Sequence, residues 1–241
     1  MDLFFIRHGQ SENNRLWIET GSDSGRVSDP RLTELGRRQA ARLGEFLRTG
    51  NLRGGGTHSH TEPEEGIGIT HIYSSLMLRA VETGSIAAQA LGLPLRAWVE
   101  IHEEGGIYLA DPTTGEPAGL PGSDRAFFEA NFPGFILPDS LDHAGWWGSK
   151  PLEPYEARLP RAQGFLQDLL ERHGGTDDRV AIVSHGGFFN LLLKALLNLP
   201  RDYPSWFTSY NCGVSWIEFK DREVNFQYLN RTDFLPPEMI S

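Results

Sequence analysis

The stretch Leu3-Phe4-Phe5-Ile6-Arg7-His8-Gly9 decides the fold of this chain. Its first four residues are all apolar, so a strand formed by them must be covered on both faces, as in a parallel sheet between two layers of helices. This strand runs directly into Arg7 and His8. Because open α/β sheets bind their ligands beyond the carboxyl ends of the strands, we expect this arginine and this histidine to lie at a functional site.

Two further segments resemble the first strand. Residues 71–73 and 180–183 are short, β-prone and followed by small or polar residues. Helical patterns lie between and after them, at about 33–47, 78–91 and 187–198, with Thr33 as a candidate N-cap of the first. This alternation predicts an α/β fold, a three-layer α/β/α sandwich with a mainly parallel central sheet and right-handed crossovers.

The end of the chain predicts a β-hairpin. Residues 214–219 and 224–229 are rich in β-branched and aromatic side chains and flank a short polar connection. We expect this hairpin to close one edge of the sheet. An exposed strand there would offer an edge for a possible homodimer.

Two segments fit no regular element. Residues 49–68 contain three consecutive glycines and the histidines His58 and His60, and we expect a solvated loop that lacks the ligand count and rigidity of a metal site. The stretch from Gly105 to Pro154 is rich in Gly and Pro but also in Phe and Trp. We interpret it as an insertion that forms a lid or subdomain on a single domain spanning residues 1–241.

Composition narrows the classes of function. The chain has 241 residues and a formal net charge of −10, which disfavours nucleic acid or an anionic membrane as a partner. Its one cysteine, Cys212, excludes an internal disulfide. The sequence has neither a signal peptide pattern nor an apolar stretch long enough to span a membrane, so we expect a soluble, cytoplasmic protein. An anionic ligand would have to be bound by local arginines.

The predicted topology brings such arginines together. Three strands direct Arg7, His8, Arg79 and His185 toward one edge of the sheet, and the helix after His185 presents backbone N–H groups to a bound anion. Arginine matches phosphate oxygens, and a nearby cation disfavours imidazolium, which leaves a histidine available as a nucleophile. These residue types therefore indicate phosphoryl transfer through a covalent intermediate. A general acid for the leaving oxygen would come from the carboxylates at positions 100, 103 and 104, which follow an expected strand at residues 95–99.

Four motifs in order along the chain carry a family resemblance. They are Arg7-His8-Gly9, Leu32-Thr33-Glu34-Leu35-Gly36 with Gln39-Ala40, Ser75-Leu76 with Arg79-Ala80 and Thr83, and Ser184-His185-Gly186-Gly187. Together they resemble the histidine phosphatase superfamily, also called the phosphoglycerate mutase-like family. The resemblance spans almost the whole chain. One departure is Ser75, which stands where the family usually has a proline.

The resemblance implies roles for individual residues. His8 would be phosphorylated transiently, Arg7, Arg79 and His185 would form the phosphate pocket, with Gly186 beside them, and Ser11 and Asn14 would line the entrance. Many members place a glycine four residues after the acid, a spacing that this chain does not reproduce. We select Glu103 as the general acid because Glu103-Glu104-Gly105-Gly106-Ile107-Tyr108 resembles a subgroup pattern, with Glu104 as the alternative.

These features predict a phosphomonoester hydrolase that acts on a small phosphorylated substrate and needs neither metal nor cofactor. One alternative is a 2,3-bisphosphoglycerate-dependent phosphoglycerate mutase. Mutases resemble one another in an arginine-rich lid, whereas residues 105–154 carry only Arg125 and Lys150 as cations, which favours the hydrolase. A further alternative is a catalytically silent module that binds a phosphorylated ligand.

Overall fold

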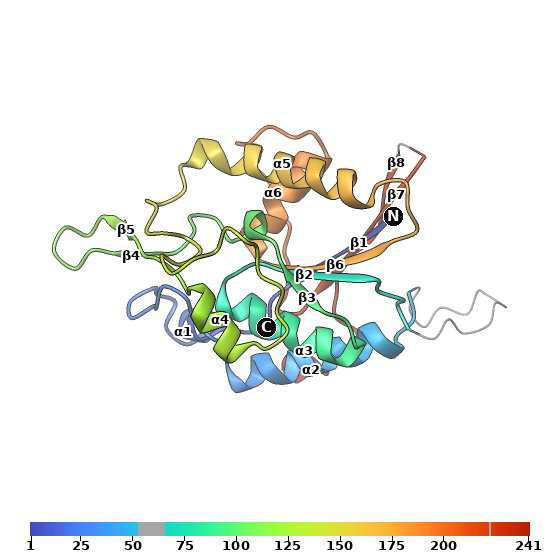
Figure 1. Ribbon diagram of the computed structural model, residues 1–241, viewed down its shortest axis with the longest axis horizontal. Coiled ribbons are helices and arrows are strands. Elements are labelled where there is room, and N and C mark those ends of the chain that lie inside the picture. The colour runs from blue at the N-terminus through green and yellow to red at the C-terminus, as the bar shows by residue number, and fades with distance from the viewer. Residues whose placement is uncertain (53–65, 222) are drawn as a thin grey trace.

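The computed structural model of the chain describes residues 1–52, 66–221 and 223–241 (Figure 1). The expected loop histidines, His58 and His60, lie outside the described residues. The strands are β1 (Asp2–Arg7), β2 (His71–Ser74), β3 (Leu95–Ala97), β4 (Tyr108–Ala110), β5 (Pro117–Gly119), β6 (Arg179–Ser184), β7 (Val214–Lys220) and β8 (Glu223–Arg231). The helices are α1 (Glu12–Thr20), α2 (Glu34–Thr49), α3 (Leu78–Leu91), α4 (Arg125–Asn131), α5 (Tyr155–His173) and α6 (Gly186–Leu196), with the short 3-10 helices η1 (Val99–Ile101) and η2 (Pro237–Met239).

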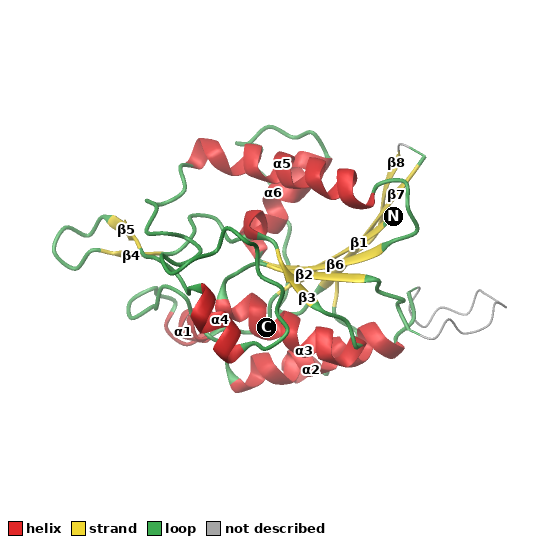
Figure 2. Cartoon of the chain, in the orientation of Figure 1, coloured by secondary structure: helices red, strands yellow, loops and turns green. Residues whose placement is uncertain are grey.

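A six-stranded sheet forms the centre of the molecule, in the order β3-β2-β6-β1-β7-β8. The neighbours among β3, β2, β6 and β1 are parallel, and β7 and β8 are antiparallel additions that form the hairpin expected from the sequence. Helices α5 and α6 cover one face of the sheet, and α2 and α3 cover the other (Figure 2). The predicted α/β sandwich with a mainly parallel sheet is confirmed.

The apolar run of β1 explains why both faces are covered. Phe4 and Ile6 point into the core shared with α2 and α3, whereas Leu3 and Phe5 point into the core shared with α5 and α6. All four side chains are fully buried. Because successive side chains of a strand point to opposite faces, one run of four apolar residues supplies both cores.

Two elements differ from the sequence-based expectation. Helix α5 was not expected, and it contains Pro160, a residue that usually ends or kinks a helix. The buried side chains Phe165 and Leu169 hold it against the sheet, so tertiary packing outweighs the cost of the proline. The strand expected over residues 95–99 ends at Ala97, and the chain turns into η1.

The insertion, residues 105–154, packs into the core of the domain. It contains the β4–β5 hairpin and α4, and Phe128 of α4 is fully buried in the same hydrophobic cluster as Ile6 and Leu76. Its backbone also covers the outer edge of β3, where Ile136 O accepts from Ala97 N at 2.9 Å and Ile136 N donates to Leu95 O at 2.9 Å. The aromatic residues of the insertion thus share the core of the α2 and α3 side instead of forming a separate one.

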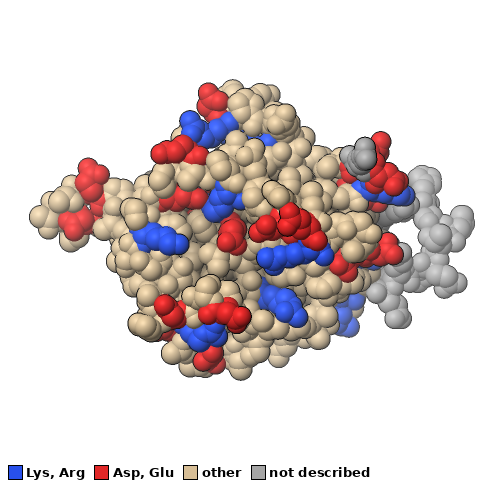
Figure 3. All heavy atoms as spheres, turned by 45° about the horizontal axis from the view of Figure 1, so that its top comes forward, with Lys and Arg blue, Asp and Glu red and all other residues tan. Residues whose placement is uncertain are grey.

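Charged side chains are mixed on the surface. Among the described residues on the face shown in Figure 3, Lys and Arg side chains lie interspersed with Asp and Glu, so that face carries no extended patch of one charge. No helix in the described part of the chain is long and apolar enough to cross a membrane.

The shared core predicts the effect of truncating the insertion. We expect Phe128→Ala to lower the free energy of unfolding by about 3–5 kcal/mol, because it opens a cavity in a fully buried site, and chemical denaturation should still show one transition. Phe127→Ala is the matched control, and its cost should be smaller because Phe127 is only partly buried. A separate, earlier transition for the insertion in Phe128→Ala would contradict a shared core.

Candidate active site

The carboxyl ends of β1, β2 and β6 meet at one edge of the sheet and bring the predicted residues together. His8 follows β1, His185 follows β6, and Arg79 lies in the first turn of α3, just after β2. The ring centroids of His8 and His185 are 5.1 Å apart, and Arg79 Nε donates to His8 Nε2 at 3.1 Å. Residues far apart along the chain thus lie in direct contact, as the strand pattern predicts.

The His8 ring is held in one orientation and one tautomer. Its Nδ1 lies 2.7 Å from the carbonyl oxygen of Gly9. Since a carbonyl only accepts, Nδ1 carries the proton and Nε2 keeps its lone pair, which accepts from Arg79. Burial, and then the positive charges of Arg79 and Arg7, hold the pKa of His8 well below its usual value. His8 is therefore a neutral imidazole with a lone pair beside two guanidinium groups.

The second histidine is held by an unusual partner. His185 Nε2 lies 2.7 Å from Ser75 Oγ, so the serine that stands in place of the usual proline orients this ring. Its Nδ1 is buried and has no hydrogen-bond partner within the described ranges. Burial and the charge of Arg79 lower the pKa of His185 well below its usual value. Ser75 thus contacts one ring nitrogen of His185, and the other ring nitrogen is buried without a partner among the described residues.

Arg79 is held by an acid that no pattern in the sequence singles out. Asp29 Oδ1 lies 3.9 Å from Arg79 Nη1 and also accepts from the backbone N–H of Leu78 at 2.9 Å, which caps the start of α3. Burial raises the pKa of Asp29 to about 6, although Arg79 opposes that shift. Asp29 lies in an irregular segment 50 positions before Arg79, so only the tertiary structure relates the two.

Arg7 uses one nitrogen of its guanidinium group in a hydrogen bond, and another nitrogen has no partner among the described residues. Its Nη1 donates to the carbonyl oxygen of Ser209, whereas its buried Nε has no hydrogen-bond partner in the part of the chain that the structure describes. Burial lowers the pKa of Arg7, and Glu103 acts in the opposite direction. The guanidinium thus keeps a donor for an anion.

Glu103 contacts the start of α6. Its carboxylate accepts from the backbone N–H groups of Gly187 at 3.3 Å and Phe188 at 3.1 Å. Its charge also raises the pKa of Arg7 and of Arg79, against the lowering effect of burial. Gly187 is needed for this approach, because a Cβ atom there would lie 2.3 Å from Glu103 Oε1.

Glu104, the alternative acid, faces a different partner. Its Oε2 forms an ion pair with Arg158 Nη1 at 2.6 Å. Within the described residues, the Glu103 carboxylate accepts only from backbone N–H groups, those of Glu104, Gly187 and Phe188, and its charge acts on the active-site arginines. The two neighbouring carboxylates therefore lie in different surroundings.

The remaining predicted residues lie around this centre. Ser11 is the N-cap of α1, and its side chain contacts Asn14, whose Oδ1 accepts from Asn211 Nδ2 at 3.3 Å. Asn211 in turn donates to the carbonyl oxygen of His8 at 2.9 Å. Ser11 and Asn14 thus support the loop after β1, and their contact with a substrate stays a prediction. At Gly186, the first residue of α6, a Cβ atom would lie 3.8 Å from Arg7 Nε.

A cavity of about 350 Å³ opens beside this group. Its walls are Arg7, Glu103, Glu104, Gly186, Gly187, Trp206, Phe207, Thr208 and Ser209. Trp206, in the segment after α6, is 67% exposed at its rim. The cavity wall thus combines an arginine, two carboxylates and aromatic side chains, and it does not include His8, Arg79 or His185.

Comparison with known proteins places this arrangement in a family. The model of the histidine phosphatase superfamily (branch 1) matches residues 3–59 and 62–232. The chain is 23% identical over its whole length to the serine/threonine-protein phosphatase Pgam5, mitochondrial, of Caenorhabditis briggsae, and it spans 66% of that protein's length. It is also 24% identical to the protein named Probable phosphoglycerate mutase GpmB of Yersinia pestis, over 92% of this chain and 86% of that one.

Solved structures agree on the fold. A phosphoserine phosphatase from Entamoeba histolytica superimposes with a TM-score of 0.60 at 18% identity, covering 98% of this chain and 99% of the other. A mycobacterial glucosyl-3-phosphoglycerate phosphatase gives 0.59 at 22% identity, covering 96% and 99%. The family match covers nearly the whole chain and includes both histidine motifs, so the protein belongs to the histidine phosphatase superfamily.

Proposed function

We propose that this protein is a phosphomonoester hydrolase that acts on a small phosphorylated substrate through a phosphohistidine at His8. The orientation of the His8 ring is the single observation that carries the proposal. Its Nε2 lone pair is free of a proton because Nδ1 donates to Gly9, and Arg79 contacts that same nitrogen. A neutral imidazole beside buried guanidinium groups is suited to attack a phosphorus atom whose oxygens those groups bind.

The first step transfers the phosphoryl group to the enzyme. His8 Nε2 forms a bond to phosphorus as the ester P–O bond breaks, and protonated Glu103 gives its proton to the departing oxygen. Arg7, Arg79 and His185 stabilise the charge on the phosphoryl oxygens. The open Nε of Arg7 and the unpartnered Nδ1 of His185 support this assignment, because both are buried groups that a phosphate oxygen would satisfy.

The second step releases phosphate. A water molecule loses its proton to the Glu103 carboxylate and attacks phosphorus, the P–N bond breaks, and the lone pair returns to His8 Nε2. Glu103 ends protonated, as it began, and no metal ion takes part. The position of Glu103 against Gly187, Phe188 and the two arginines supports its role in both steps.

A phosphoglycerate mutase is the second candidate, because a relative carries that name and the chemistry at the histidine would be the same. Mutases resemble one another in a lid whose arginines bind substrate, but Arg125 and Lys150 of the insertion contact groups of the insertion itself. This favours the hydrolase over the mutase. Arg125 donates to the carbonyl oxygens of Leu141 and Pro138, and Lys150 lies over the Trp147 ring. A silent binding module would not need an unprotonated ring nitrogen on His8 at this position.

We expect His8→Ala to abolish phosphate release from an aryl phosphate while the circular dichroism and unfolding transition stay close to wild type. The reason is that no other group replaces the nucleophile. Quenched wild-type enzyme should contain an acid-labile phosphohistidine, which mass spectrometry would locate at His8. Turnover by His8→Ala would rule out the mechanism, isomerisation of 3-phosphoglycerate without phosphate release would favour a mutase, and binding without turnover would favour a silent module.

The two neighbouring carboxylates provide a matched pair. We expect Glu103→Gln to lower kcat by about 100- to 10,000-fold, because general acid–base catalysis is lost, whereas Glu104→Gln should retain a kcat near wild type. Gln at position 103 still accepts hydrogen bonds from the start of α6, so the fold should persist. Steady-state kinetics with a poor leaving group would show the difference most clearly. A larger loss in Glu104→Gln would reverse the assignment.

The pKa of His8 predicts an unusual response to pH. A histidine in water gains its proton near pH 6.5, but burial and the two arginines lower the pKa of His8, so its ring should stay neutral at pH values where a free histidine already carries its proton. The unfolded chain does gain that proton, so this residue should reduce stability as the pH falls below 6.5. NMR of the imidazole resonances would test this, and a midpoint near 6.5 for His8 would contradict it.

A further inference from the structure

A second group of histidine and acidic side chains lies at the other end of the sheet. His71 is the first residue of β2, His173 is the last residue of α5, and Asp178 directly precedes β6. Because β2 and β6 are parallel neighbours with His71 opposite Val180, their amino ends meet here. The catalytic histidines follow the carboxyl ends of strands, so this group is separate from the active site.

The three side chains each direct a possible ligand atom toward the others. These atoms all lie within 4.8 Å of one another. Asp178 Oδ2 lies 2.8 Å from His173 Nδ1, and Asp178 Oδ1 lies 3.7 Å from His71 Nδ1. The first distance is a hydrogen bond, but the second is too long for one. Adjacent ligands of a tetrahedral zinc ion are about 3.4 Å apart, so these two nitrogen–oxygen separations, which involve different oxygens of Asp178, are close to those of a metal site.

Neighbouring groups already orient these side chains. His173 Nε2 lies 3.1 Å from the hydroxyl of Tyr73, and the ring is only 4% exposed. When His173 Nδ1 binds a metal, the ring proton must sit on Nε2, where the Tyr73 oxygen can accept it. Histidine ligands commonly have such a partner on their second nitrogen. Thr70 Oγ1 contacts His71 Nδ1 at 2.9 Å and would have to release it.

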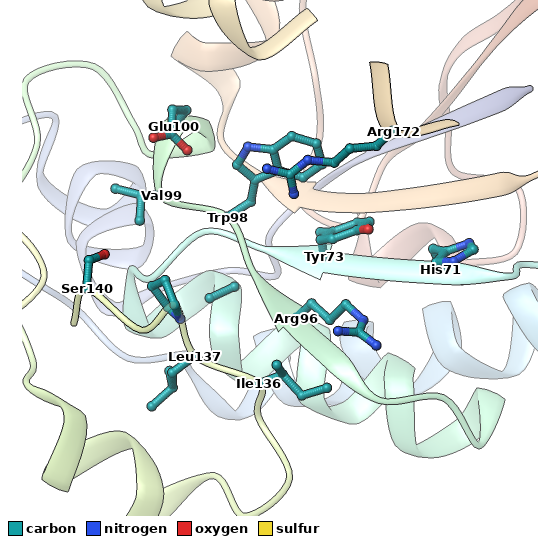
Figure 4. A pocket seen from close by; sticks show the side chains of 12 residues that line it. His71, Tyr73, Arg96, Trp98, Val99, Glu100, Ile136, Leu137, Ser140 and Arg172 are labelled. Atoms are coloured by element: carbon teal, nitrogen blue, oxygen red, sulfur yellow. The ribbon is translucent and has the colours of Figure 1, made fainter. Parts of the chain in front are cut away.

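The site is open to solvent on one side. The His71 side chain is 36% exposed and the Asp178 side chain 26%. His71 also lines a cavity of about 480 Å³, together with Tyr73 of the same strand, β2, and Arg172 of α5 (Figure 4). An ion can therefore enter, and water can complete its coordination.

We propose that His71, His173 and Asp178 bind one divalent transition-metal ion of the zinc type. Two imidazoles and one carboxylate suit Zn²⁺ and Co²⁺, whereas Mg²⁺ and Ca²⁺ prefer oxygen ligands only. The ion would join the start of β2, the end of α5 and the entry to β6. Since these lie at the end of the sheet opposite His8 and His185, the bound ion stabilises the fold and takes no part in phosphoryl transfer.

Metal binding to the purified full chain, stripped with a chelator, tests the proposal. We expect isothermal titration to show one Zn²⁺ per chain, Co²⁺ to give visible absorption bands of a nitrogen- and oxygen-bound ion, and Zn²⁺ to raise Tm. His71→Gln and Asp178→Asn should each weaken binding by about 100-fold or more, since even partners of metal ligands contribute 10- to 100-fold. Tyr73→Phe should weaken it less.

Matched controls are available in the same chain. Exposed His143 and Asp177 lie outside the group, so His143→Gln and Asp177→Asn should bind Zn²⁺ as the wild type does. His71→Gln changes a partly exposed side chain and should fold and keep the wild-type kcat. Absence of binding to the wild-type chain would overturn the proposal. So would full binding by both His71→Gln and Asp178→Asn, which would locate the ion elsewhere.

Discussion

The structure depends on keeping one imidazole neutral and correctly oriented beside two buried positive charges. The carbonyl oxygen of Gly9 accepts from His8 Nδ1, which carries the proton, and Arg79 Nε donates to the other ring nitrogen, Nε2. Each guanidinium in turn needs a compensating group, because an unpaired buried charge is costly. Asp29 lies near Arg79, Ser209 accepts from Arg7, and Glu103 influences both. The loop after β1, the start of α3 and the start of α6 are therefore coupled through charge.

Backbone geometry at the start of α6 is part of the same constraint. Two N–H groups of that helix bind Glu103, and Gly187 leaves room for its carboxylate. The helix N-terminus thus holds the proposed general acid in place while the strand before it delivers His185. The first residues of α6 therefore bind the Glu103 carboxylate, directly follow His185 and form part of the wall of the cavity beside Arg7.

Much of this arrangement could be predicted from local patterns. The apolar run of β1, the N-cap Thr33 and the helix end at Leu91 follow from periodicity and capping, and the structure bears them out. Helix α5 could not be predicted in this way, because Pro160 disfavours a helix. Only packing of the helix against the sheet outweighs the cost of the proline. The same holds for Asp29 and Ser209, whose importance comes from contacts across the fold and not from their neighbours in sequence.

The sequence by itself determined the fold class, the family, and the convergence of Arg7, His8, Arg79 and His185, because strand polarity and motif order are local properties of the chain. Only the tertiary structure decided the environment of each group. It distinguishes Glu103 from Glu104, because only Glu104 pairs with Arg158, and it places Ser75 within hydrogen-bond distance of His185. It also brought His71, His173 and Asp178 together. Charge, burial and hydrogen bonding act through space, so they are settled only once the chain has folded.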